Sequence, residues 1–297
     1  MKTLIDFDNA AVVAIPVTGG FGEAGVRECM LLEGPQGWGE FSPPRDADDA
    51  GRWLTAAVEP GTVGWPDPVR GRIPVAVRVP AVDPGRAREL VRASGCGTAE
   101  VAVGDLDDVV RLEAVRDALG PAGKIRCTAP GTWDTDTAVA RIGALKRVAG
   151  EIEFVARPCA TADDVAAVRR RIDVPLAGID LLVLNSAALG GVRRALRIAE
   201  KSGLPGVVSA GRETSIGLSS AAALAGALPE LPYACAVSRP AWVVGDVVSD
   251  SRAMVTTDGY LPVAPMPPAP DHELLARFAI TDPGRLTWWR ERLANAR

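Results

Sequence analysis

A chain of 297 residues is long enough for one large α/β barrel or for two ordinary domains. Its composition, 47% hydrophobic and 24% charged, is that of a folded globular protein and excludes an intrinsically disordered one. A formal net charge of -4 without a dense basic run argues against a nucleic-acid partner. No apolar stretch reaches the roughly 18 residues that a membrane span needs, and the N-terminus does not resemble a signal peptide. We therefore expect a cytoplasmic protein with no membrane partner.

The N-terminal part alternates short apolar runs with Gly/Pro turns. It predicts antiparallel strands at 11–15 and 29–33 around a loop at 18–23, followed by a helix at 46–58. We interpret residues 1–70 as an α+β capping domain. The C-terminal segment, about 255–297, is expected to pack on it and contains a Pro-rich loop and a helix at 282–294.

From residue 71 to about 254 the pattern changes to apolar strands that alternate with amphipathic helices. This alternation indicates βα units and a parallel sheet, and six or seven consecutive units favour a closed (β/α) barrel over an open sheet. The expected strands are 75–79, 99–103, 125–128, 153–156, 181–185 and 206–209. The expected helices are 84–94, 107–119, 134–149, 161–171, 190–202 and 217–227.

Residues 174–185 interrupt this alternation of strands and helices. Neighbouring parallel strands need a crossover of about a dozen residues, and the segment is too short to supply one. Either the barrel has lost one strand/helix unit, or one irregular strand replaces two.

Several strings are similar to a known family. Residues 38–43 (WGEFSP), 72–75 (RIPV), 189–193 (LGGVR) and 209–217 (SAGRETSIG) resemble segments of actinobacterial o-succinylbenzoate synthases, members of the enolase superfamily. The resemblance covers nearly the whole chain. It implies an enolase-type modified (β/α) TIM barrel with an N-terminal α+β capping domain.

The resemblance also implies a syn-dehydration that uses two lysines and a divalent metal on three carboxylates. The positions that match the family's first lysine pair are Glu100 and Ala102, and the opposing lysine is matched by Asn185. Two metal-ligand positions are matched by Thr128 and Ala156, and the third falls in the shortened segment, where Asp180 is the one conceivable substitute. We therefore expect no metal and no other cofactor, because hard cations need several carboxylates.

The residues that now line the implied pocket are the candidates for a functional site. The catalytic candidates are Glu100, Arg157 and Asn185. Glu100 would be a general acid or base if burial raised its pKa, or it pairs with an arginine such as Arg157 and fills space. The candidates for substrate binding are Thr128, Gly190, Gly191, Ser209, Arg212 and Ser215. For the glycines and small residues, the alternative is that they only let the loops turn.

Three functional hypotheses follow. The first is a repurposed, metal-independent cyclase or lyase that acts on a small organic acid or on a polyene intermediate of secondary metabolism. The second is a catalytically inactive protein that binds a ligand or a partner. The third is o-succinylbenzoate synthesis for menaquinone. The first two require a small-molecule or protein partner, and the sequence does not fix the oligomeric state.

Overall fold

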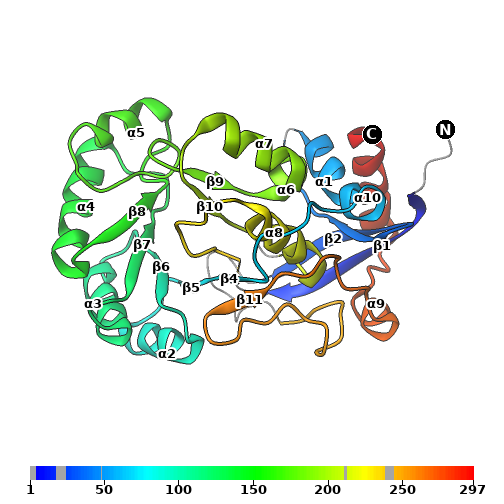
Figure 1. Cartoon of the computed structure of the whole chain (residues 1–297), viewed down its shortest axis with the longest axis horizontal. Coiled ribbons are helices and arrows are strands. Elements are labelled where there is room, and N and C mark those ends of the chain that lie inside the picture. The colour runs from blue at the N-terminus through cyan, green and yellow to red at the C-terminus, as the bar shows by residue number, and fades with distance from the viewer. Residues whose placement is uncertain (1–4, 18–24, 48, 211–212, 238–243) are drawn as a thin grey trace.

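The computed structural model of the chain describes residues 5–17, 25–47, 49–210, 213–237 and 244–297. A barrel with helices on its outside occupies one end of the molecule (Figure 1), and a twisted antiparallel sheet with the C-terminal helix beside it occupies the other. The expected enolase-type architecture, a capping domain with an α/β barrel, is confirmed. The expected loop at 18–23 lies outside the described residues.

The capping sheet has the order β1-β2-β3, and its strands are β1 (Asp6–Val17), β2 (Gly25–Gly34) and β3 (Gly37–Phe41). Alternating residues point to opposite faces of the sheet. Met30 and Phe41 pack on one face with the helices α1 (Ala50–Thr62) and α10 (Pro283–Ala296). Cys29 and Leu31 pack on the other face with α9 (His272–Phe278) and with residues of the barrel loops. The sheet is therefore buried on both faces.

The barrel strands run parallel and are separated by helices on the outside. The strands are β5 (Ala76–Val79), β6 (Thr98–Ala102), β7 (Lys124–Thr128), β8 (Ile152–Ala156), β9 (Leu182–Leu184) and β10 (Gly206–Val208). The helices are α2 (Pro84–Ser94), α3 (Asp108–Leu119), α4 (Thr135–Ala149), α5 (Ala162–Arg169), α6 (Ser186–Leu189), α7 (Val192–Ser202) and α8 (Ser215–Ala227). Parallel pairs of single residues, Ser209 with Ala236 and Val75 with Cys235, close the ring.

The irregular segment 170–181 joins α5 to β9 and contains no helix. Leu176 pairs with Val155 of β8, and Leu181 pairs with Ala177 of the same short segment. Asp180 fastens the segment, because it accepts hydrogen bonds from the Leu176 amide (2.8 Å) and from Arg169 Nε (2.7 Å). The segment thus keeps a strand position at Leu176 and Ala177 and leads into β9 through a short turn, so the ring has lost the crossover helix between these two positions and not a whole strand/helix unit.

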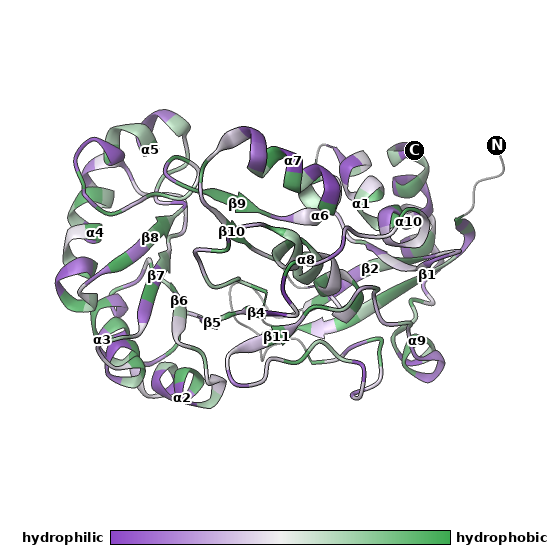
Figure 2. Ribbon diagram, viewed as in Figure 1, coloured by the Kyte–Doolittle hydropathy of each residue, from purple (hydrophilic) through white to green (hydrophobic). Residues whose placement is uncertain are grey.

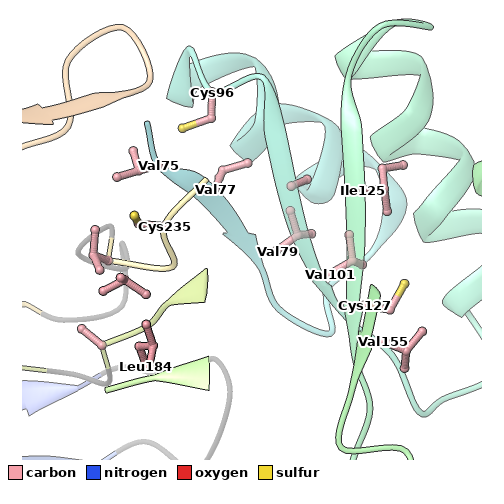
Figure 3. Close-up of a cluster of buried hydrophobic side chains, with 14 of the residues drawn as sticks. Val75, Val77, Val79, Cys96, Val101, Ile125, Cys127, Val155, Leu184 and Cys235 are labelled. Carbon is pink, nitrogen blue, oxygen red and sulfur yellow. The ribbon is translucent and has the colours of Figure 1, made fainter. Parts of the chain in front are cut away.

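The outward faces of the strands form the main hydrophobic core. Figure 3 shows Val79, Val101, Cys127 and Val155 stacked across neighbouring strands, where they are fully buried. All five cysteines are buried and unpaired, as the sequence predicts. β7 carries hydrophilic residues between its hydrophobic ones (Figure 2), and these alternate positions point into the barrel.

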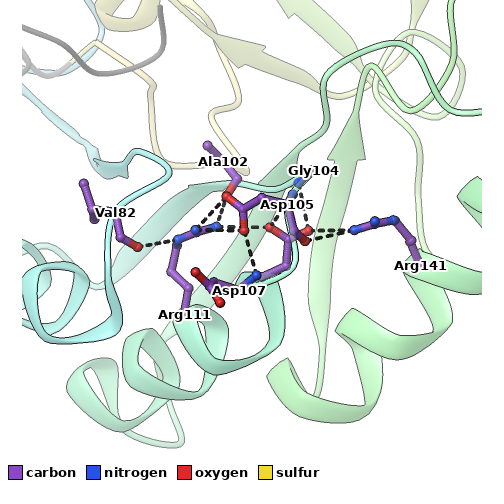
Figure 4. A network of polar contacts seen from close by, with 8 residues as sticks. Val82, Ala102, Gly104, Asp105, Asp107, Arg111 and Arg141 are labelled. Carbon is purple, nitrogen blue, oxygen red and sulfur yellow. Dashed lines mark hydrogen bonds and ion pairs between the residues drawn. The ribbon is translucent and has the colours of Figure 1, made fainter.

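A polar network fixes the loop between β6 and α3 (Figure 4). Arg111 is almost completely buried, and its guanidinium contacts Asp105 (2.8 Å), Asp108 (3.0 Å) and the carbonyl oxygen of Val82 (2.8 Å). Arg141 of α4 contacts the second oxygen of Asp108 (3.3 Å). One buried cation therefore organises the chain at the carboxyl end of β6.

The C-terminal segment serves both units. Strand β11 (Tyr260–Pro262) pairs with β4 (Arg72–Pro74) at the start of the barrel, whereas α9 and α10 pack on the capping sheet. The domain limits at 70 and 254 stay a prediction. Among the described helices, we find none whose length and apolar character would let it cross a bilayer.

Candidate functional site

Three charged side chains stand side by side inside the barrel. Arg78 of β5 is in register with Glu100 of β6, which is in register with Arg126 of β7. The Nε and Nη2 atoms of Arg126 both lie 3.0 Å from Glu100 Oε2, and Nε of Arg78 lies 4.0 Å from Glu100 Oε1. Thr128, two residues after Arg126 on the same face, donates its hydroxyl proton to Glu100 Oε1 over 3.4 Å. These four residues are called the barrel cluster below.

The arginines hold Glu100 in its ionised form. Burial alone would raise the pKa of Glu100, but the guanidinium groups of Arg126 and Arg78 outweigh burial and lower the pKa below its ordinary value. The condition for Glu100 to act as a general acid or base, a raised pKa, is therefore not met. The expected pairing with an arginine is confirmed, but its partners are Arg126 and Arg78 and not Arg157.

The two arginines are themselves anchored by the barrel wall. Arg126 is fully buried, donates to the carbonyl oxygen of Ala234 (2.6 Å) and lies 5.2 Å from the Phe154 ring centroid. Arg78 donates to the carbonyl oxygen of Ala236 (2.8 Å). Two cations face one carboxylate, so the barrel cluster carries a net positive charge.

The other two catalytic candidates lie elsewhere. Arg157 follows β8, is exposed, and has a left-handed backbone with φ 51°. Asn185 follows β9, and its side-chain oxygen accepts the Ala188 amide proton (3.0 Å) at the start of α6. Across the described ranges, no hydrogen bond or ion pair joins any two of Glu100, Arg157 and Asn185.

The turn with Gly190 and Gly191 is closed by protein groups. The Gly191 amide donates to the carbonyl oxygen of Ser186 (2.8 Å), and the Gly190 amide donates to that of Ala187 (3.3 Å). The next two amides, of Val192 and Arg193, donate to the carboxylate of Glu59 from the capping helix α1 (2.5 and 3.0 Å). This arrangement favours the interpretation in which the two glycines let the chain turn.

The serines differ in access. Ser215 is fully buried; its hydroxyl donates to Asp246 and accepts the Met254 amide proton (2.8 Å), so it is not open to a substrate. Ser209 is partly exposed at the end of β10, and its hydroxyl lies 3.5 Å from Arg78 Nη2. Ser209 therefore lies next to the barrel cluster, to which Thr128 belongs. Arg212 lies outside the described residues.

The residues at the implied metal positions do not fit a divalent cation. Thr128 hydrogen-bonds to Glu100, Ala156 has no ligand atom in its side chain, and Asp180 is bound by Arg169 and the Leu176 amide. In the part of the chain that the structure describes, no group of three or more His, Cys, Asp or Glu side chains is placed to hold a metal. Hard cations need several oxygen ligands with negative charge.

A second group of charges lies where the capping domain meets the barrel. Glu40 of β3 is buried and accepts hydrogen bonds from the Thr214 amide (2.9 Å) and hydroxyl (2.6 Å). Burial raises the pKa of Glu40 to about 7; Arg27 opposes this change and Glu213 adds to it. Glu213 borders a cavity of about 560 Å³, which Asn185 also lines.

The sequence interpretation missed Arg78, Arg126 and this buried acidic pair. A signal for the arginines existed, because each occupies an inward position of a strand next to the one that carries Glu100. No comparable local signal existed for Glu40 and Glu213, which are brought together by packing between the two domains.

Comparisons with known proteins agree with this architecture. Residues 12–61 match the family model described as enolase N-terminal domain-like, and residues 84–183 match the one described as enolase C-terminal domain-like. The o-succinylbenzoate synthase of Thermobifida fusca is 45% identical over 96% of this chain and 94% of its own length. That of Mycolicibacterium smegmatis is 37% identical over 95% and 93%.

Solved structures extend the likeness of the fold. The muconate lactonizing enzyme from Pseudomonas fluorescens complexed with muconolactone superposes with a TM-score of 0.76 at 17% identity, covering 93% of this chain and 98% of that one. The L-Ala-D/L-Glu epimerase from Bacillus subtilis gives a TM-score of 0.72 at 19% identity, covering 90% and 98%.

Proposed function

Because this chain belongs to the o-succinylbenzoate synthase family of the enolase superfamily, we propose that it is an enzyme that acts on a small organic acid without a metal, as a lyase or a cyclase. The observation that carries the proposal is the barrel cluster. Arg78, Glu100 and Arg126 occupy the interior of the barrel, where the resemblance leads one to expect lysines and metal-bound carboxylates.

The net positive charge of the barrel cluster favours an anionic substrate. A carboxylate of the substrate would be drawn to Arg78, which is less buried than Arg126 (11% against 0% side-chain exposure). Fixed positive groups in a partly dry site stabilise negative charge that develops during a reaction, and they need no reorganisation. The arginines would thus supply the electrostatic part of catalysis.

The state of Glu100 limits the chemistry. A carboxylate with a lowered pKa is ionised and is a weak base, so it is poorly suited to remove a weakly acidic proton. The reaction that suits the barrel cluster is one whose barrier is lowered by orientation and charge stabilisation, such as a ring closure or an elimination from an activated acid. Glu100 would position Arg78 and Arg126, while Thr128 and Ser209 would bind the substrate. A polyene intermediate of secondary metabolism is one such substrate class.

Binding of a dicarboxylate in the absence of metal tests the proposal. Calorimetry with o-succinylbenzoate in EDTA should give binding, and Arg78→Gln should weaken it by about tenfold, because it removes one charge-assisted contact. Arg88→Gln removes an exposed arginine that pairs with Asp117 on the outside of the barrel, and it should change nothing. Binding that requires magnesium would contradict the proposal.

A turnover assay separates the reactions. The o-succinylbenzoate precursor should not be dehydrated faster with magnesium or manganese than in EDTA. Metal-dependent turnover would instead mean that a set of ligands exists in this chain and that it makes o-succinylbenzoate, as the names of its relatives suggest.

One observation favours the alternative, a catalytically inactive binding protein. The polar groups of Glu100 are already engaged by Arg126, Arg78 and Thr128, and a saturated ion pair can be purely structural. Tight binding of organic acids, without turnover of the precursor or of related hydroxy acids in either condition, would support this alternative.

A further inference from the structure

The cavity beside Asn185 lies between the capping domain and the carboxyl end of β9. It has a volume of about 560 Å³, within the range of about 300–1,000 Å³ that is typical of small-molecule sites. Residues of β2, α1, α10 and the chain after β3 form its capping wall, and Asn185 and Glu213 form its barrel wall. Helix α6, which follows β9, lies against the capping helix α1 (Figure 1).

Two neighbouring strand ends connect this cavity with the barrel cluster. The Ser209 amide donates to the carbonyl oxygen of Leu184 (3.0 Å), which continues the parallel ladder of β9 and β10. Ser209 therefore lies beside Asn185, at a strand spacing of about 5 Å. The hydroxyl of Ser209 lies 3.5 Å from Arg78 Nη2, and Asn185 lines the cavity. The cavity thus begins one strand away from the residue that adjoins the barrel cluster.

The side chains of Asn185 and Ser209 both face the inside of the barrel. Val183 and Val207 are in register two residues earlier, and Val207 packs with Phe154 inside the barrel. Alternate residues of a strand share a face, and Asn185 keeps an extended backbone (φ -107°, ψ 109°). Asn185 and Ser209 are both partly exposed, so the surface that leads from the barrel cluster to the cavity is accessible.

Protein groups already neutralise two of the charged residues at this cavity. Glu28 accepts a hydrogen bond from Trp289 Nε1 (2.8 Å), and its other oxygen contacts Arg45. Arg285 contacts the same oxygen as Arg45. Burial alone would raise the pKa of Glu28, but these groups hold the pKa below its ordinary value. The side chain of Arg45 is 81% exposed, so its charge lies largely in solvent.

The other two charged residues also offer the cavity little charge. Arg27 donates to the carbonyl oxygen of Ser42 (2.8 Å), and it lies close enough to Glu40 to oppose the rise in the pKa of that carboxyl group. Glu213 is 5% exposed, and its Oε2 atom is buried. A charged end of a ligand would leave water here without a free partner of opposite sign among these four residues, which is costly. The cavity therefore favours an uncharged group.

The rest of the wall is apolar. It is formed by Trp53 and Trp289 with Pro43, Pro44 and Val26. Such a surface suits a hydrocarbon or aromatic group. The barrel cluster, by contrast, carries a net positive charge and attracts a carboxylate to Arg78.

We propose that the ligand of the barrel cluster is a monocarboxylate with an elongated, uncharged apolar tail. Its carboxylate contacts Arg78 and Ser209, and its tail passes over Asn185 into the cavity, where it packs on the two tryptophans. This inference rests on the proposed function, because it starts from a carboxylate at Arg78. It adds that the substrate is charged at one end only and that its other end occupies the cavity between the domains.

Calorimetry in EDTA with three straight-chain acids tests this inference on the unmodified protein. Butanoate is too short to reach the cavity from Arg78, decanoate reaches it, and decanedioate reaches it with a second carboxylate. Each methylene group that leaves water strengthens binding by about fourfold, so decanoate should bind at least about tenfold more tightly than butanoate. It should also bind at least about tenfold more tightly than decanedioate, whose far end would be an unpaired charge. Equal affinity of decanoate and either other acid would overturn the inference.

Variants then locate the two ends of the ligand. Arg78→Gln should weaken decanoate and butanoate alike, by about tenfold. Val26→Asp places a charge on the cavity wall at an exposed position, so it should weaken decanoate by at least about tenfold and leave butanoate unchanged. Val69→Asp, at an exposed valine that does not line the cavity, should change neither affinity. Decanoate binding that is insensitive to Val26→Asp or to Arg78→Gln would contradict the assignment.

The failure of this inference is distinguishable from that of the proposed function. If o-succinylbenzoate binds through Arg78 but decanoate binds no more tightly than butanoate, the tail site is refuted and the proposed function stands. If neither o-succinylbenzoate nor any of the three acids binds, both are refuted.

Discussion

Neutralising Glu40 should change how stability depends on pH. Glu40 joins the capping domain to the barrel through its two hydrogen bonds with Thr214, and its Oε1 atom is buried without a partner. Glu40→Gln preserves the shape of the side chain and an acceptor for Thr214, but removes the titratable group. The pKa of Glu40 is raised, mainly by burial, from an ordinary value of 4.5 to about 7.

The direction of the effect follows from proton binding. Between pH 4.5 and 7 the folded state holds a proton at Glu40 that the unfolded state has released, so the free energy of unfolding falls as the pH rises. The stabilisation is fully present below pH 4.5 and is lost as the pH rises through 7. One pKa unit corresponds to about 1.4 kcal/mol, so the loss amounts to about 3 kcal/mol.

Urea unfolding of both proteins from pH 4.5 to 8.5 measures this effect. The free energy of unfolding of the natural protein should fall by about 3 kcal/mol relative to Glu40→Gln across this range, because the contributions of all other groups cancel in the difference. Glu33→Gln, an exposed change on the neighbouring strand β2, should follow the natural protein. Parallel curves for the natural protein and Glu40→Gln would refute the reasoning.

Three further substitutions should lower stability. Glu100→Gln leaves the fully buried Arg126 without its carboxylate and should cost about 3 kcal/mol in urea unfolding; an unchanged midpoint would show that the ion pair does not form. Gly191→Ala places a methyl group 2.5 Å from Glu59 Oε2 on a backbone with φ 108°, so the melting temperature should fall by several degrees. The control Gly203→Ala also adds a methyl group at a positive φ, 66°, but this group meets no neighbour, so its effect should be smaller. Arg111→Met removes the cation between Asp105 and Asp108 and should cost about 3 kcal/mol, and Arg86→Met, at an exposed pair on α2, should cost less than about 1 kcal/mol.

Much of the fold was predictable from periodicity. The expected helix at 84–94 coincides with α2, and the expected strand at 125–128 lies within β7, because regular alternation of apolar residues and strong end signals coincide there. Asp83 caps α2 and Gly95 ends it, as such residue types commonly do. The last strand position of the barrel, at Cys235 and Ala236, was missed. It pairs with each neighbouring strand through a single residue, and so short a strand leaves no alternation of apolar and polar residues in the sequence.

The site was less predictable, because its contacts join residues that are distant in the chain. The inward direction of Glu100 followed from strand alternation, and its partner Arg126 occupies the same register on the next strand. The closing of the Gly191 turn by Glu59, by contrast, depends on how the capping helix α1 lies against the barrel. No local pattern specifies that approach.

The segment between α5 and β9 has a consequence for how barrels of this type can be shortened. Asp180 lies in the short turn between the strand position at Leu176 and β9, where other units of the ring have a crossover helix, and it binds the Leu176 amide and Arg169 at the end of α5. The ring of strands still closes. A barrel of this type therefore tolerates the loss of one outer helix when a single side chain holds the remaining turn by hydrogen bonds. A barrel redesigned for minimal length could use the same arrangement, in which one carboxylate binds a backbone amide of the turn and an arginine of the preceding helix.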